Sequence, residues 1–175
     1  ELLPNDEREA MVLNKPKPPS GLVYSEFNPD RHVIDNFKYS PSMGGRIAID
    51  WGFRKPSVLV IVYDEVREAS IVVHEINPQE VTIEQLSTMI LQVAWPRSMQ
   101  ASAPGKRIWI DTGVADKAGR ARSDHTGLSA FSLIRKTPSE GVIGLPLRST
   151  TDPVRIDILN GVQRLKRAFN SNKYL

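Results

Sequence analysis

The apolar residues between positions 46 and 63 fall into two short groups that polar and turn-forming residues separate. Residues 46–49 are mostly apolar and rich in β-favouring types, and residues 57–63 form a longer apolar run. Gly52 and Pro56 lie between the groups, and both residue types interrupt strands and favour turns. The pattern therefore predicts a β-hairpin whose first strand ends at Asp50. Its expected core residues are Ile47, Ile49, Val58 and Val60.

A second segment, residues 106–113, repeats this arrangement. Two basic residues precede a short apolar strand, Asp111 ends the strand, and Gly113 follows. If the two strands lie side by side, the carboxylates of Asp50 and Asp111 converge at one edge, where α/β sheets place their ligand sites. Two hard oxygen donors with no softer donor nearby suit Mg²⁺ or Mn²⁺. For Asp50 alone, an Asx turn toward Gly52 is the alternative.

The remaining apolar patterns complete the order of elements. Apolar residues spaced three and four apart predict a helix over residues 82–93, with Thr82 as N-cap and Gln85 closing a capping box. Similar patterns predict helices over residues 127–136 and 153–169, and strands over residues 70–76, 108–111 and 142–147. The order β-β-β-α-β-α-β-α predicts an α/β domain with a mixed five-stranded sheet and helices on both faces.

Length and composition indicate one globular domain. Residues 1–20 are polar and proline-rich, and they are expected to form an N-terminal segment and linker ahead of a domain at residues 21–175. No apolar run approaches the roughly 20 residues of a membrane span, so no membrane partner is expected. The lack of cysteine excludes disulfides and thiolate metal sites. Because the chain begins with Glu1, it is expected to be a fragment or a processed product.

The formal net charge is only +3, but the charges are unevenly distributed. Residues 1–100 contain 10 lysines and arginines against 14 acidic residues, whereas residues 101–175 contain 13 against 6. A basic half of the chain favours a polyanionic partner, most often nucleic acid. An ordinary solvated surface is the alternative explanation.

The order of elements, with an aspartate at the ends of the first and fourth strands, resembles the RNase H-like (RuvC/integrase) nuclease superfamily. Within it, the chain is similar to the C-terminal nuclease domain of the large terminase subunit of tailed bacteriophages. The matching segments are residues 21–35 (GLVYSEFNPDRHVID), 47–64 (IAIDWGFRKPSVLVIVYD), 108–113 (IWIDTG) and 144–166 (GLPLRSTTDPVRIDILNGVQRLK). The resemblance implies an RNase H-like fold for residues 21–175.

The resemblance also implies an activity, a cofactor and partners. The family cuts concatemeric double-stranded DNA during viral genome packaging, with two Mg²⁺ or Mn²⁺ ions held by three acidic residues. On that pattern Asp50 and Asp111 are the first two metal ligands and catalytic residues. Asp157 does not match the third motif, so the third acid is expected beyond Leu175, with the domain truncated there.

In the full protein, this family implies an N-terminal packaging ATPase, a portal and a small terminase subunit as partners, in the cytoplasm of an infected bacterial host. The chain itself contains no G-x-x-x-x-G-K-[ST] phosphate loop. The motor is therefore expected to precede Glu1.

Several basic residues are candidates for DNA contacts in the two-metal mechanism that the resemblance implies. Those expected to touch phosphates near the site are Arg54, Lys55 and Arg148. Those expected to hold the DNA backbone, with salt-sensitive affinity, are Lys117, Arg120 and Arg122. His125 is a candidate minor ligand. For each of the basic residues, a role in surface solubility is the alternative.

Two other functions remain open at this point. The D-W-G and D-T-G segments resemble the phosphate-binding turns of actin and sugar-kinase ATPases, which favours an ATPase fragment. A non-catalytic DNA-binding or assembly domain with an incomplete acidic site is the second alternative. Whether the chain binds ATP or DNA separates an ATPase from a nuclease. A Mn²⁺ titration separates a nuclease from a non-catalytic domain, since an incomplete acidic site should show no saturable Mn²⁺ binding.

Overall fold

The computed structural model describes residues 23–52, 54–102, 105–122, 127–135, 144–149 and 158–171. The predicted hairpin is confirmed: β1 (Gly44–Asp50) pairs antiparallel with β2 (Ser57–Asp64). A tight turn leads from β2 to β3 (Ala69–Ile76), so the first three strands form an antiparallel meander. Alternate residues of the hairpin are buried because one side of it faces the core. All four core residues expected from the sequence are buried: Ile47, Ile49, Val58 and Val60.

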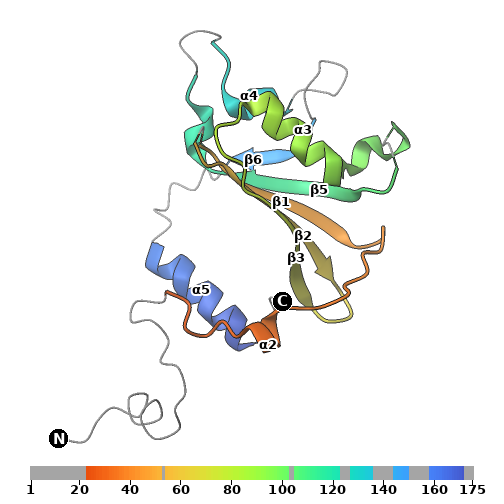
Figure 1. The fold of residues 1–175 in the computed structure, drawn as a ribbon, viewed down its shortest axis with the longest axis vertical. Coiled ribbons are helices and arrows are strands. Elements are labelled where there is room, and N and C mark those ends of the chain that lie inside the picture. Colours follow the sequence, from red (N-terminus) through yellow and green to blue (C-terminus); the bar gives the residue numbers. More distant parts are fainter. Residues whose placement is uncertain are drawn as a thin grey trace, which may run out of the picture.

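The sheet has six strands rather than five, in the order β3-β2-β1-β5-β4, with β6 paired to β5 (Figure 1). The additional strand is β4 (Ala94–Pro96), which directly follows a helix and runs parallel to β5 (Ile108–Ala115). β5 also runs parallel to β1 and to β6 (Leu147–Ser149). The predicted mixed α/β sheet is confirmed, while β6 begins where the predicted fifth strand was expected to end.

Two helices, α3 (Ile83–Val93) and α4 (Ala130–Arg135), cover one face of the sheet (Figure 1). The capping box at the start of α3 is present, since the Thr82 and Gln85 side chains each accept a hydrogen bond from the other residue's backbone N–H. The buried face of these helices completes the core against β1 and β5. Its residues are Leu86, Ile90, Phe131 and Ile134.

The other face of the sheet is turned toward α5 (Ile158–Asn170) and the short helix α2 (Pro29–His32), as Figure 1 shows. We call it the α5 face. α5 lies within the range of the predicted last helix, but residues 150–157 are outside the described part. Two 3₁₀ segments, η1 (Arg97–Ser102) and η2 (Lys117–Arg120), complete the elements. No helix in the described ranges is long and apolar enough to cross a bilayer.

His32 connects the segment before β1, residues 24–32, to the end of α5. A lone histidine in a turn segment usually lies at the surface, but His32 is only 4% exposed. Its Nδ1 accepts a hydrogen bond from the Asn28 N–H, and its Nε2 lies 2.9 Å from the Phe169 carbonyl oxygen. The rings of Tyr24 and Phe27 pack edge-on against Phe169. This contact was not predictable from local pattern, because its two halves lie 137 residues apart.

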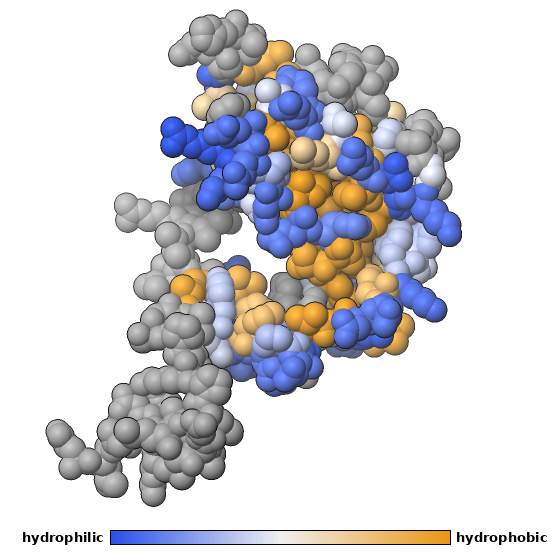
Figure 2. Space-filling view, viewed as in Figure 1, coloured by the Kyte–Doolittle hydropathy of each residue, from blue (hydrophilic) through white to orange (hydrophobic). Residues whose placement is uncertain are grey.

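An apolar hollow of about 680 Å³ separates α2 and α5 from the strands β2 and β3. Figure 2 shows apolar side chains gathered on the sheet side of this hollow. Its walls include Leu59 and Ile61 from the sheet and Leu165 and Phe169 from α5. The last helix therefore touches residues 24–32 more closely than it touches the sheet.

Candidate active site

Asp50 is the last residue of β1, and its side chain is exposed. Because side chains alternate along a strand, Asp50 shares the α5 face with Arg46 and Ala48. It pairs across the hairpin with Ser57, the first residue of β2. The carboxylate thus stands at the carboxyl end of a central strand, as the sequence predicts.

Asp111 does not join Asp50 there. β5 continues past Asp111 to Ala115, so Asp111 lies inside the strand instead of ending it. The Gly45 N–H donates to Asp111 Oδ2 at 2.9 Å, which places Asp111 beside the start of β1. Asp50 is five positions further along, or about 16 Å at the usual rise of a strand. The prediction that these two carboxylates converge at one edge is therefore wrong.

The surroundings of Asp111 are those of a structural carboxylate. Arg97 contacts it through both Nε and Nη2, and the same guanidinium donates to the carbonyl oxygens of Pro41 and Met43 at 2.9 and 2.8 Å. Burial by itself raises the pKa of Asp111, but the hydrogen bonds from Arg97 and from the Gly45 N–H outweigh it and hold the pKa below its ordinary value. The charge of Asp111 is therefore already compensated by Arg97.

The acid beside Asp50 is Asp116, which the sequence analysis missed. Ile49 of β1 pairs with Ala115 of β5, and the Asp116 N–H donates to the Ile49 carbonyl oxygen at 3.1 Å. Asp50 and Asp116 line the same shallow depression of about 340 Å³ on the sheet. Asp116 Oδ1 accepts the Ala118 N–H at 2.7 Å, while Oδ2 has no partner within the described residues. The sequence does contain a signal for this acid: a run of small and apolar residues continues the strand through Ala115, so that Asp116 directly follows its end.

Trp51 fixes the position of Asp116 relative to Asp50. It follows Asp50 directly, and its indole N–H donates to the Asp116 carbonyl oxygen at 2.7 Å. The indole lies against Gly119 of η2, where a Cβ atom would come within 2.1 Å of Trp51 Nε1. Since only glycine leaves room for this contact, Trp51 and Gly119 together hold the start of η2 against the end of β1.

We expect Trp51→Phe to weaken Mn²⁺ binding about tenfold, because residues that orient metal ligands typically affect affinity by roughly that factor or more. The lost hydrogen bond should also lower the free energy of unfolding by about 1 kcal/mol. Trp95→Phe is the matched control, since the Trp95 indole donates to the Met99 carbonyl oxygen at 3.1 Å, away from the depression. Calorimetric titration and urea unfolding measure the two effects. Equal Mn²⁺ affinities for both variants would contradict the positioning role.

Asp50 and Asp116 fit a hard divalent cation. Each contributes a carboxylate to one depression, and no Cys or His lies in its lining. Within the described ranges, no cluster of three metal-ligating side chains is present. Asp157 and His125, which the sequence analysis weighed as possible ligands, lie outside the described residues.

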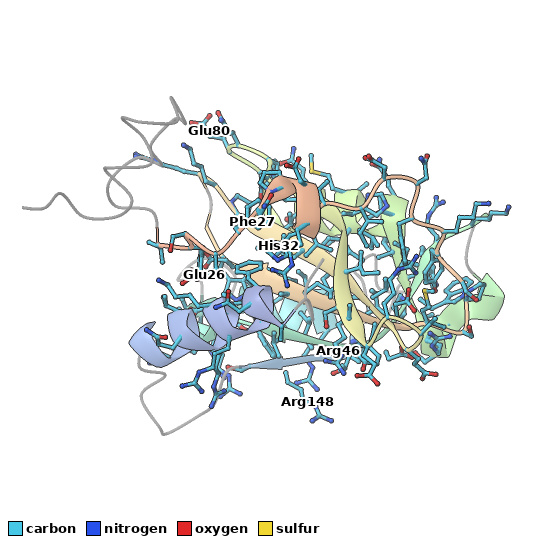
Figure 3. All side chains as sticks on the ribbon, turned by 90° about the horizontal axis from the view of Figure 1, so that it is seen from below. Glu26, Phe27, His32, Arg46, Glu80 and Arg148 are labelled. Atoms are coloured by element: carbon cyan, nitrogen blue, oxygen red, sulfur yellow. The ribbon has the colours of Figure 1, made fainter. Side chains whose placement is uncertain are left out.

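The predicted DNA-contact residues separate into three groups. Arg54 and Lys55 follow Asp50 in the β1–β2 turn, and Lys117 follows Asp116, so these three lie close to the acidic pair along the chain. Arg120 is instead held over the Phe131 ring at 5.8 Å, and Arg122 pairs through its backbone with Ser129, so both lie toward α4. Arg148 lies on β6 and is exposed (Figure 3).

No protein-family model and no curated protein sequence matches this chain. Among solved structures, the P22 large terminase nuclease domain superposes with a TM-score of 0.62 at 11% identity, covering 89% of this chain and 71% of that domain. The large terminase of the thermophilic bacteriophage D6E gives a TM-score of 0.59 at 14% identity, over 89% of this chain. The match spans about a third of the D6E protein. The chain has an RNase H-like fold, which it shares with the P22 nuclease domain and with part of the D6E large terminase.

Proposed function

We propose that this chain is a nuclease domain that cleaves double-stranded DNA with the help of Mg²⁺ or Mn²⁺. The observation that carries the proposal is the placement of Asp50 and Asp116 at the ends of adjacent parallel strands. The fold shared with the P22 terminase nuclease domain supports the same conclusion. The reaction is hydrolysis of a phosphodiester bond at this edge of the sheet.

Asp50 and Asp116 would hold the metal ions in this proposal. Divalent ions bound there would lower the pKa of an attacking water and stabilise the charge on the leaving 3′ oxygen. Asp116 offers Oδ2, since its Oδ1 already accepts the Ala118 N–H. Arg54, Lys55 and Lys117 provide positive charge around the acidic pair and attract the phosphates of the substrate.

Asp116 here takes the second-ligand role that sequence resemblance assigns to Asp111. Asp111 instead holds the start of β1 to β5 through the Gly45 N–H and Arg97. The ATPase alternative has less support, because the Asp111–Gly113 segment lies within β5 and forms no phosphate-binding turn. The third acid of a terminase-like site is expected outside the described residues.

A DNA-binding or assembly domain without catalysis is the second candidate. The observation that favours it is that, among the described residues, only Asp50 and Asp116 contribute carboxylates to the depression. In either case we propose a role in viral genome packaging, with a packaging ATPase, a portal and a small terminase subunit as partners in the cytoplasm of the bacterial host.

Metal removal tests the choice between the two candidates. We expect supercoiled plasmid incubated with the chain and Mn²⁺ to be cut to linear and shorter DNA, because the reaction needs ions held by Asp50 and Asp116. EDTA should stop the cutting, and excess Mn²⁺ should restore it. Agarose gels follow the cleavage, and calorimetry follows Mn²⁺ binding. DNA binding without cleavage and without saturable Mn²⁺ binding would favour the second candidate.

A further inference from the structure

We propose that Arg46 and Arg148 form a phosphate-binding pair that holds the DNA backbone across β1, β5 and β6. The proposal rests on the function proposed above and adds a binding surface that borders the acidic depression. Neither residue lines that depression. The pair would act on the substrate before and independently of any metal ion.

The sheet places both arginines on the α5 face. Arg46 precedes Asp50 by four residues in the same strand, so their side chains leave the same side of β1. Arg46 pairs with Thr112 of β5, and Arg148 of β6 pairs with Val114 of β5. One strand therefore separates the two residues, or about 10 Å across the sheet. Figure 3 shows the two side chains on the same side of the sheet.

Within the described residues, both guanidinium groups are available to bind a ligand. Each residue is exposed, and neither has an ion-pair or hydrogen-bond partner within the described part of the chain. Other arginines of this domain are engaged: Arg67 pairs with Asp64 at 2.6 Å, and Arg107 donates to the Leu91 carbonyl oxygen at 2.9 Å. A guanidinium has five donors in a planar fork that matches phosphate oxygens.

The surface between the two arginines is low and uncharged. Ala48, Thr112 and Val114 occupy the positions between them on β1 and β5, and Val114 is 49% exposed. Small side chains there leave the backbone of a duplex room to approach. Phosphate contacts of this kind position DNA without reading its sequence.

The charges on the α5 face allow DNA binding to be measured separately from DNA cleavage. Without metal, the carboxylates of Asp50 and Asp116 repel phosphates, while Arg46 and Arg148 attract them. The arginine pair thus contributes to DNA affinity in the absence of metal. Loss of Asp50 should abolish cleavage and tighten DNA binding, since one negative charge is removed.

The test is DNA binding by the full chain in EDTA, measured by fluorescence anisotropy of a short labelled duplex over a series of salt concentrations. We expect Arg46→Gln and Arg148→Gln each to lower affinity about tenfold and to reduce the slope of log affinity against log salt by about one. Lys106→Gln removes the same charge from the exposed loop before β5 and should leave the slope unchanged. Arg46→Lys should retain the salt slope.

Salt slopes for Arg46→Gln and Arg148→Gln equal to that of Lys106→Gln would overturn the proposal, provided that thermal melting shows all three variants folded. If melting shows that one glutamine variant is unfolded, the glutamine variant of the other arginine decides: a slope lowered by about one supports the pair, and a slope equal to that of Lys106→Gln overturns it. If the arginine effects appear but Mn²⁺ supports no cleavage, the phosphate-binding pair stands and the nuclease proposal fails.

Discussion

Replacing Asp116 by Asn is expected to lower Mn²⁺-dependent DNA cleavage by at least about a hundredfold, the upper range for residues that merely orient a metal ligand. The reason is that Asp116 and Asp50 line the same depression at the ends of β5 and β1. Asn keeps the Oδ1 acceptor that caps η2 through the Ala118 N–H, so the fold should be retained. Plasmid cleavage rates and calorimetric Mn²⁺ titration of the variant measure the effect.

Asp111→Asn is the matched control for Asp116→Asn. It removes the same charge from a carboxylate that Arg97 and the Gly45 N–H already engage. We expect cleavage to stay within a few-fold of the wild type and the free energy of unfolding to fall by about 1 kcal/mol or less, as for other partly exposed ion pairs. If Asp111→Asn instead abolished cleavage while Asp116→Asn did not, the assignment from sequence would be right and the site proposed here wrong.

Gly45→Ala is expected to destabilise the domain by about 3 kcal/mol or more, at the upper end of the cost of overpacking. A Cβ atom at this position would come within 2.0 Å of the Trp109 carbonyl oxygen. The obstructing atom belongs to the backbone of β5, so β1 and β5 would have to separate locally to relieve the clash. Urea unfolding followed by circular dichroism measures the change in the free energy of unfolding.

The neighbouring Gly44→Ala provides the control. Its nearest Cβ contact would be Asp111 Oδ2 at 3.8 Å, which is an ordinary van der Waals distance. An alanine in a strand also loses less conformational entropy on folding than a glycine, so Gly44→Ala should be neutral or slightly stabilising. Equal stabilities for the two variants would contradict the close approach of β1 and β5 at Gly45.

Local sequence signals were sufficient for the meander and for α3. The hairpin needed only alternating apolar residues and a turn, and the capping box of Thr82 and Gln85 lies within a single helical turn. These features depend on residues that are close in the chain, so the spacing of apolar, turn and capping residues is enough to predict them. The aspartate at the end of β1 was predictable for the same reason.

The second acid was not predictable by the same route. A charged residue after three apolar ones normally marks the end of a strand, yet Asp111 sits at a shift in register between β1 and β5, where Gly45 and Arg97 accommodate it. The parallel pairing with β1 shows that β5 continues to Ala115. The short strand β4 and the burial of His32 likewise depend on partners distant in sequence.

β1 joins two kinds of pairing, antiparallel with β2 and parallel with β5. The first closes through a short turn, whereas the second must bring together segments separated by three strands and the helix α3. Long loops close more slowly in folding. The meander can therefore form early, with β5 added in a later step. A chain halted between these steps has Asp50 in place without Asp116 beside it. The proposed cleavage site is thus a late product of folding, and a half-folded domain would be unable to cut DNA.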